Sequence, residues 1–184
     1  MDKNKLYTYT LLALGIIVFI FSYIGVYFNV ESTIEKLTEI QYKSSQREAK
    51  EIVRLLETQL QSGISEEETI KNLQNSIENT NTTMGFICMF NAAGVEICHP
   101  DPKKIGNQIT ANNSKVNGLL NSDSGSFLNL LQSQTETGGV REFNKSANRN
   151  SEIIYLQPVK GTDWMVAAHS NLDVVRTEVS LIRK

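Results

Sequence analysis

The longest apolar pattern in the chain lies near its N-terminus, where residues 6–30 contain no charged side chain. A helix needs about 20 such residues to cross a bilayer. Aromatic residues stand toward both ends of the stretch, as in the aromatic belts of membrane helices: Tyr7, Tyr9, Tyr23, Tyr27 and Phe28. A secretory signal peptide would have a shorter apolar core followed by small residues. The pattern therefore predicts an uncleaved transmembrane helix over residues 6–30.

Positive charges precede this stretch and mixed charges follow it. Lys3 and Lys5 lie before the span, whereas Lys36 lies after it among three glutamates. The positive-inside rule counts the lysines close to the span and places the N-terminal side in the cytoplasm. We therefore expect a cytoplasmic N-terminus of residues 1–5 and an extracytoplasmic chain from Glu31 onward, anchored in the inner (cytoplasmic) membrane.

Residues 31–62 are expected to form one long helix, because no Gly or Pro interrupts them. Two apolar groups recur at helical spacing, with polar residues 41–50 between them. The upper group is Ile34, Leu37 and Ile40, and the lower group is Ile52, Leu55, Leu56 and Leu60. In one interpretation the lower group packs on the domain and the polar part is a solvated stalk. In a second, compatible interpretation the upper group packs against the same helix of a second subunit, which predicts a homodimer.

A β-hairpin is predicted in the middle of the chain. The unbroken apolar run at 86–90 is typical of a strand buried on both faces. Asn91-Ala-Ala-Gly94 predicts a turn, because Asn initiates turns through its side chain and Gly accepts a positive φ. Residues 95–98 then predict a second strand that ends before Pro100, since Pro cannot donate to a ladder.

Shorter signals predict the remaining elements. Ser65 and Glu68 form a capping box, which predicts a helix ending near Asn79. Apolar residues at 127–131 predict a short helix. Three further strands are predicted at 140–143, 152–158 and 164–169, and Asn171 or Asp173 can cap a final helix.

The hairpin and the segment after it resemble a known family. His99-Pro-Asp-Pro-Lys-Lys-Ile-Gly106, following an Asx-x-x-Gly turn, is similar to the Cache domain, an extracytoplasmic relative of PAS domains in bacterial receptors. Tyr155-Leu-Gln-Pro-Val-Lys-Gly-Thr-Asp-Trp164 is similar to the last hairpin of that family. Asn91 departs from the family, which more often has Asp there, but both residues form this turn.

The resemblance implies an α+β fold, in which a transmembrane helix and a long helix precede a PAS-like five-stranded antiparallel sheet. The expected organisation is a cytoplasmic end (1–5), a span (6–30), a stalk or dimerisation helix (31–62), a Cache sensor domain (63–170) and a final helix leading toward the membrane (171–184). Family turns have four loop residues, which would place Cys88 and Cys98 on opposite faces as buried thiols. A three-residue loop would place them directly opposite each other.

Catalytic and metal-binding patterns are weak. His99 and His169 are far apart in sequence and have no acidic residue at ligand spacing, so no metal or other cofactor is expected. Cys98 and His99 are neighbours on a strand and would point to opposite faces. His99 is instead expected to hydrogen-bond the loop after it. With a net charge of −2 and no basic excess, a nucleic-acid partner is not expected either. We do not expect this chain to be an enzyme.

A small-molecule pocket is the remaining expectation. In Cache domains the ligand lies between the sheet and the segments that cover its far face, which here are residues 105–134. The polar candidates on the strands beneath are Arg141, Tyr155, Gln157 and His169. Arg141 carries a permanent planar cation suited to a carboxylate. The aromatic-plus-arginine pattern with which the family recognises amines is absent from the covering helix, so an amino acid is not predicted.

The chain is expected to be the extracytoplasmic ligand-sensing region of a bacterial transmembrane receptor. Among such receptors, a sensor histidine kinase is favoured. A chemoreceptor or a nucleotide cyclase receptor would have the same pattern. An alternative of another class is a membrane-anchored PAS-like interaction or assembly domain without a ligand. A cytoplasmic output domain beyond this chain is expected in the first case.

Overall fold

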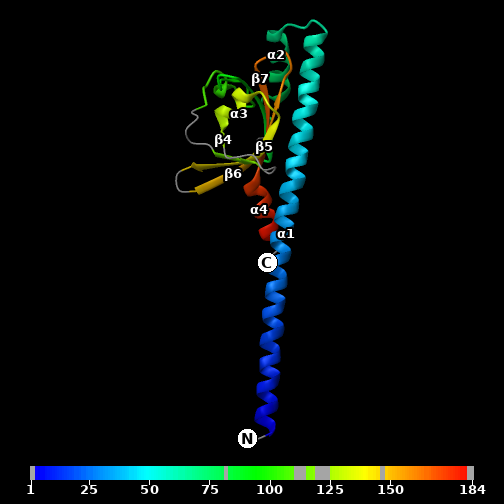
Figure 1. The fold of residues 1–184 in the computed structure, drawn as a ribbon, viewed down its shortest axis with the longest axis vertical. Coiled ribbons are helices and arrows are strands. Elements are labelled where there is room, and N and C mark those ends of the chain that lie inside the picture. Colours follow the sequence, from blue (N-terminus) through cyan, green and yellow to red (C-terminus); the bar gives the residue numbers. More distant parts are fainter. Residues whose placement is uncertain (1–2, 81–82, 110–114, 119–124, 146–147, 182–184) are drawn as a thin grey trace.

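The chain begins with one long helix. The structure, a computed structural model, describes residues 3–80, 83–109, 115–118, 125–145 and 148–181. Helix α1 (Lys3–Gln61) runs without a break for 59 residues (Figure 1). In the part of the chain that the structure describes, no helix is found that is long and apolar enough to cross a membrane, so the span predicted over residues 6–30 is not confirmed.

The rest of the chain alternates short helices with strands. The elements are α2 (Glu66–Ile77), β1 (Gly85–Asn91), β2 (Glu96–Cys98), the 3-10 helix η1 (Pro102–Lys104), β3 (Lys115–Gly118), β4 (Gly125–Ser126), α3 (Phe127–Ser133), β5 (Thr137–Lys145), β6 (Asn148–Pro158), β7 (Trp164–Asn171) and α4 (Leu172–Leu181). The predicted cap of α2 is confirmed, because the Ser65 hydroxyl accepts the Glu68 N–H at 3.2 Å. Of the two predicted caps of α4, Asn171 is the one used: its Oδ1 accepts the Asp173 N–H at 3.0 Å.

The strands form one antiparallel sheet in the order β2-β1-β7-β6-β5-β3-β4. The five predicted strands are β1, β2, β5, β6 and β7, and they lie side by side in the sheet in the order β2-β1-β7-β6-β5. Two short strands, β3 and β4, extend the β5 edge in a segment that the sequence predicted only as cover. The loop predicted between the third and fourth strands is shorter, because β5 continues to Lys145 and β6 begins at Asn148.

The central hairpin has the predicted turn. The Asn91 side chain accepts the Val95 N–H at 2.9 Å, and Gly94 has φ of 79°. The two strands pair with Met89 opposite Cys98, next to a bulge. Cys88 and Cys98 therefore belong to different faces of the sheet, and both are buried thiols, as predicted.

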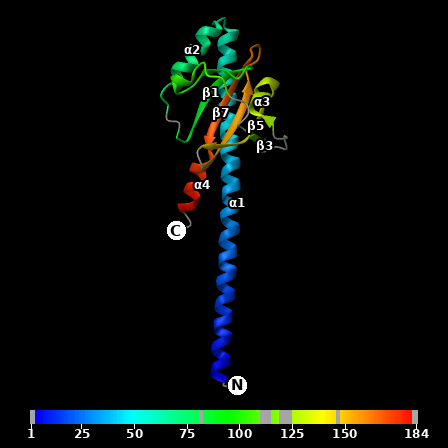
Figure 2. The ribbon, with the colours of Figure 1, turned by 90° about the vertical axis from the view of Figure 1, so that its left-hand side faces the viewer.

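Two layers cover the sheet (Figure 2). We call the face that packs against α1 and α2 the helix face and the one that packs against α3 the cover face. The helix-face core includes Ile87, Met89, Ile153, Trp164 and Val166. The cover-face core is a separate cluster: Cys88, Phe90, Phe127, Leu131, Ile154, Leu156, Met165 and Ala167.

The middle of α1 is not the solvated stalk that the sequence predicted. Its buried residues are Tyr42, Ser45, Ala49, Val53 and Leu56, at helical spacing. The Ser45 hydroxyl lies 2.8 Å from that of Ser170 on β7, and Tyr42 packs edge-on to Tyr155 on β6. Residues 41–50 thus bury polar side chains by pairing them. Leu55, expected to pack on the domain, is 52 % exposed.

Gly138 allows this close packing of α1. It was predicted to lie before the third strand, but it is buried inside β5. A Cβ at this position would lie 2.5 Å from the Tyr42 ring and 2.7 Å from the Tyr155 ring. The glycine is therefore required by the approach of the two tyrosines rather than by a turn.

Candidate ligand-binding site

The centre of the cover face is a filled apolar core. Helix α3 turns Phe127 and Leu131 toward the sheet, and both are fully buried. Phe90 meets the Phe127 ring edge-on, with 5.6 Å between ring centroids. Beneath α3 the described residues thus pack as a hydrophobic layer.

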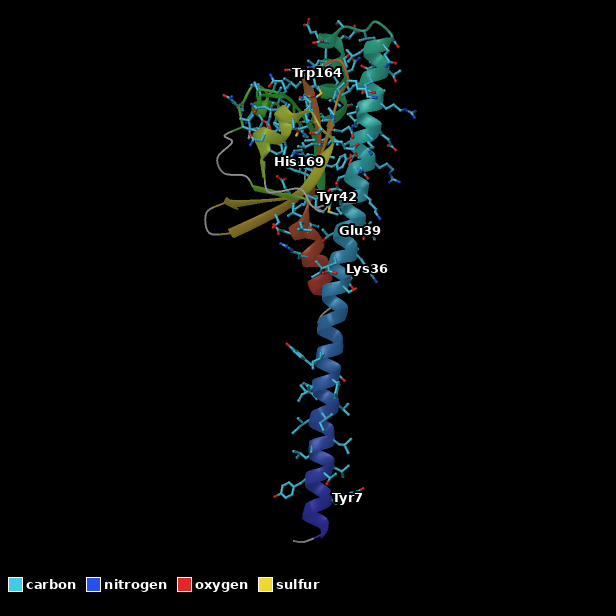
Figure 3. All side chains as sticks on the ribbon, in the orientation of Figure 1. Tyr7, Lys36, Glu39, Tyr42, Trp164 and His169 are labelled. Atoms are coloured by element: carbon cyan, nitrogen blue, oxygen red, sulfur yellow. The ribbon has the colours of Figure 1, made fainter. Side chains whose placement is uncertain are left out.

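A polar cluster lies beside this layer, where β1, β6 and β7 run toward α4. The His169 imidazole connects two groups: Nδ1 lies 3.1 Å from Glu152 Oε2, and Nε2 lies 3.2 Å from Cys88 Sγ. The Phe86 ring stacks on the imidazole with ring centroids 4.3 Å apart and planes 6° apart. The side chains of His169 and Glu152 are 4 % and 15 % exposed. Figure 3 shows His169 inside the domain, on the sheet.

Strand register explains why these residues meet. His169 on β7 is opposite Phe86 on β1 and opposite Ile154 on β6. Cys88 and Glu152 each lie two residues from one of these partners, and alternate residues of a strand share a face. Diagonal neighbours of this kind are within reach of long and aromatic side chains. The cluster is therefore a product of pairing three strands that are distant in sequence.

His99 has the structural role that was predicted for it. Its Nδ1 accepts the Asp101 N–H at 2.9 Å, which fixes the loop after β2. The side-chain amide of Gln74 on α2 makes two hydrogen bonds to the His99 backbone, each at 3.0 Å: Oε1 accepts from the His99 N–H, and Nε2 donates to the His99 carbonyl. Burial, and then the nearby Lys104 ammonium, lower the pKa of His99 from 6.5 to about 4. His99 is thus neutral at physiological pH.

Solved structures with a similar fold are sensor domains. A methyl-accepting chemotaxis protein from Vibrio parahaemolyticus RIMD 2210633 matches 80 % of this chain and 99 % of its own, with a TM-score of 0.56 and 9 % identity. A periplasmic sensor domain of a chemotaxis protein matches 73 % and 96 %, with a TM-score of 0.52 and 11 % identity. A Cache chemosensory domain, described by its carboxylic acid recognition, matches 74 % and 97 %, with a TM-score of 0.50 and 15 % identity.

The fold is that of a Cache-type sensor domain. At these identities the likeness establishes the fold alone. Searched by sequence, the chain matches no protein-family model and no curated protein. The resemblance seen in the sequence is therefore supported through structure.

Two of the four predicted site residues occupy the same region of this Cache fold. His169 lies in the polar cluster. Arg141 on β5 pairs in the ladder with Glu152, the residue that holds His169. The Arg141 side chain lies outside those that the structure describes, as do residues 110–114 and 119–124 of the predicted cover.

The other two predicted site residues are placed on the opposite face. Tyr155 is buried in the helix-face core, where its hydroxyl accepts a hydrogen bond from Gln46 of α1 at 3.1 Å. Gln157 is two residues further along β6 and shares that face, and its buried Oε1 has no partner among the described residues. The expectation that Tyr155 and Gln157 lie on the face beneath the cover was wrong. Side chains alternate between the two faces along β6, and Glu152, Ile154 and Leu156 are the residues on the cover face.

Glu152 and Cys88 were missed by the sequence analysis. Each looked like an ordinary strand residue, and only the register of β1 and β6 against β7 brings them to His169. The three side chains do not form a chelating set, because the imidazole contacts them through different nitrogens. Within the described ranges no three His, Cys, Asp or Glu side chains are placed to hold a metal ion.

Proposed function

We propose that this chain is the extracytoplasmic ligand-sensing region of a membrane signal-transduction receptor. The observation that supports it best is a Cache-type fold whose cover face carries a buried polar cluster at one end. Pockets that bind small molecules combine apolar walls with a few convergent polar groups. Helices α1 and α4 leave the sheet in the same direction and pack together, an arrangement suited to passing a change onward (Figure 1).

The ligand we propose is a small carboxylate held near Arg141, His169 and Glu152. A guanidinium binds a carboxylate through two parallel hydrogen bonds. The structural neighbour described by carboxylic acid recognition has the same fold, which makes this class the first to test. Arg141 is the residue on which the proposal depends.

Thermal-shift measurements on the 184-residue chain test this proposal. A panel of small mono- and dicarboxylic acids should contain members that raise the melting temperature, because a ligand that binds only the folded state stabilises it by mass action. Arg141→Ala should abolish the shift, whereas Arg54→Ala, on the exposed side of α1, should retain it. A shift that survives in Arg141→Ala would remove that residue from the site.

The proposed receptor is a single-pass membrane protein with its sensor domain outside. The charge-free residues 6–30 support this proposal, as do the exposed apolar side chains along α1, such as Leu12, Phe19 and Phe21. We favour a histidine kinase output over a chemoreceptor or cyclase. Labelling of Ser126→Cys from the cell exterior is expected, and labelling only after lysis would contradict the orientation.

A homodimer through α1 is part of the same proposal. Ile34 and Leu37 are half-buried and Ile40 is 61 % exposed. A hollow of about 490 Å³ opens along this part of α1, lined by Ile34, Glu35, Thr38, Glu39, Tyr42, Lys43 and Gln46. Cysteines introduced at positions 34, 37 and 40 should cross-link between subunits more than cysteines at 35 and 39. Equal cross-linking at all five positions would contradict a defined seam.

A second candidate function is a membrane-anchored interaction domain that binds no small molecule. The complete burial of Phe127, Leu131, Ile154 and Leu156 in one apolar cluster beneath α3 supports it. The two functions differ in the thermal-shift experiment: an interaction domain should show no stabilisation by any member of the panel.

A further inference from the structure

Cys88, His169 and Glu152 are arranged as nucleophile, base and orienting acid. We propose that Cys88 is an activated thiol that adds to small, uncharged carbon electrophiles of the α,β-unsaturated carbonyl class. The carboxylate lies 3.1 Å from Nδ1 of the imidazole, and the sulfur lies 3.2 Å from Nε2. This order of groups is the one that activates nucleophiles in proteins generally. The site shares His169 and Glu152 with the proposed carboxylate site, but the chemistry proposed here rests on Cys88, which the carboxylate site does not use.

The Glu152 carboxylate sets the imidazole tautomer. An ionised carboxylate only accepts hydrogen bonds, so Nδ1 carries the proton that lies between them. Nε2 then has a lone pair directed at Cys88, and the thiol S–H can donate to it. Proton transfer from sulfur to Nε2 would produce a thiolate beside an imidazolium whose charge the Glu152 carboxylate offsets.

The second cysteine shows what the same fold does without such partners. Cys98 is fully buried in the helix-face core, and its sulfur lies 3.5 Å from the carbonyl oxygen of Ile70. Burial raises the pKa of this thiol to about 12. A buried thiol without a base is inert, so Cys98 is a matched internal control.

The surroundings of Cys88 determine the class of electrophile. Cys88 is 1 % exposed and belongs to the apolar cover-face cluster, which disfavours charged reagents. Two neighbours of His169 are partly exposed, since the Glu152 side chain is 15 % exposed and Phe86 is half-buried, so we expect a small reagent to enter by local opening there. Disulfide formation with Cys98 is excluded because the two residues lie on opposite faces of the sheet.

The addition is balanced without an oxidant. The thiol proton moves to Nε2, and the sulfur lone pair forms an S–C bond to the β-carbon. The C=C π pair shifts to join the α-carbon and the carbonyl carbon, and the C=O π pair moves onto oxygen, which gives an enolate. The imidazolium then returns its Nε2 proton to the α-carbon. The net result is addition of S–H across the double bond, with His169 back in its starting state.

Competitive labelling within one molecule tests the proposal. The 184-residue chain is treated briefly with methyl vinyl ketone, quenched, and mapped by mass spectrometry at both cysteines. We expect Cys88 to be modified at least about tenfold faster than Cys98. Similar rates at the two positions would overturn the proposal.

Two variants identify the base. His169→Phe keeps an aromatic ring against Phe86 and should slow Cys88 toward the rate of Cys98, whereas Glu152→Gln should slow it less. If His169→Phe instead unfolds the domain, both cysteines react faster, and Glu152→Gln then decides the matter. If His169→Phe is folded and its Cys88 reacts at the unchanged rate, activation of Cys88 by His169 is contradicted. If His169→Phe unfolds, an unchanged Cys88 rate in Glu152→Gln contradicts it instead.

Discussion

The helix face and the cover face of the sheet differ in how they bury polar side chains. On the helix face the polar groups pair between elements, as Ser45 does with Ser170 and Gln46 with Tyr155. On the cover face they pair within the sheet, as Glu152 does with His169. The comparison teaches that polar pairs on the helix face attach the sheet to α1. The pair on the cover face joins two strands instead of a strand and a helix, and it lies beside an apolar layer where a ligand could meet it.

The two faces are connected through neighbouring residues of the same strands. His169 faces the cover, and the next residue, Ser170, bonds α1. Glu152 holds His169, while the Ser151 N–H donates to Asp173 at 3.2 Å and the Ser151 hydroxyl accepts from Arg176 of α4, also at 3.2 Å. A displacement of the polar cluster therefore moves residues that hold both helices.

The largest expected effect comes from equal truncations in the two cores. Leu56→Ala on the helix face and Leu131→Ala on the cover face each remove a fully buried side chain and should lower the free energy of unfolding by about 2–5 kcal/mol. Leu56→Ala should cost more, because the long α1 cannot collapse into the cavity as the seven-residue α3 can. Urea unfolding measures both, and equal losses would mean that the cover is as rigid as α1.

A smaller loss is expected at Gly138, where the Tyr42 ring of α1 packs against β5. Gly138→Ala places a Cβ against the Tyr42 and Tyr155 rings and should lower the free energy of unfolding by about 1–3 kcal/mol through overpacking. Gly15→Ala, which has no atom within 4 Å of its added Cβ, is the matched control and should leave the domain's urea midpoint unchanged. An unchanged midpoint for Gly138→Ala would mean that the tyrosines move apart easily.

The pH dependence of stability sharpens the account of His99. Its folded pKa of about 4 is below the unfolded value of 6.5, so the unfolded state binds more protons between these values. Its contribution is complete above pH 6.5 and declines toward pH 4, by at most about 1.4 kcal/mol per pH unit for one proton. His99→Asn, which keeps an acceptor for the Asp101 N–H, should flatten the melting temperature against pH in this window. A profile identical to that of the unmodified chain would place the titration elsewhere.

The smallest effect is expected from the hydroxyl pair that fastens α1 to β7. Ser45→Ala and Ser170→Ala should each cost about 1 kcal/mol, the net contribution of one buried hydrogen bond. In a double-mutant cycle the two losses should not add, because either change breaks the same contact. Additive losses would show that each hydroxyl is satisfied independently.

Strands β1, β2, β5, β6 and β7 and the turn at Asn91 were predictable because local pattern determines them, whereas β3 and β4 were not predicted. The apolar run at 86–90, the Asn91 turn and the Ser65 cap each stabilise structure through neighbours in sequence. The middle of α1 was not predictable in this way, because Tyr42 and Ser45 are buried by partners on β5, β6 and β7, which are distant in sequence. A periodicity analysis assigns such residues to solvent.

The candidate site was predictable only in part, for a related reason. Strand alternation indicates which residues of one strand share a face, but the face itself depends on what packs there. His169 was found because histidine is conspicuous, while Tyr155 and Gln157 were assigned to the wrong face. Glu152 and Cys88 required the register of three strands, which no local signal contains.

The unbroken course of α1 makes the helix a lever. From Tyr42, where it is fastened to the sheet, to its first residue is a length of about 58 Å at 1.5 Å per residue. A rotation of about 5° at the fastening displaces the far end by about 5 Å, close to one helical turn. A sub-ångström shift at the sheet, too small to notice in the domain itself, is thereby enlarged several-fold at the other end of the rod.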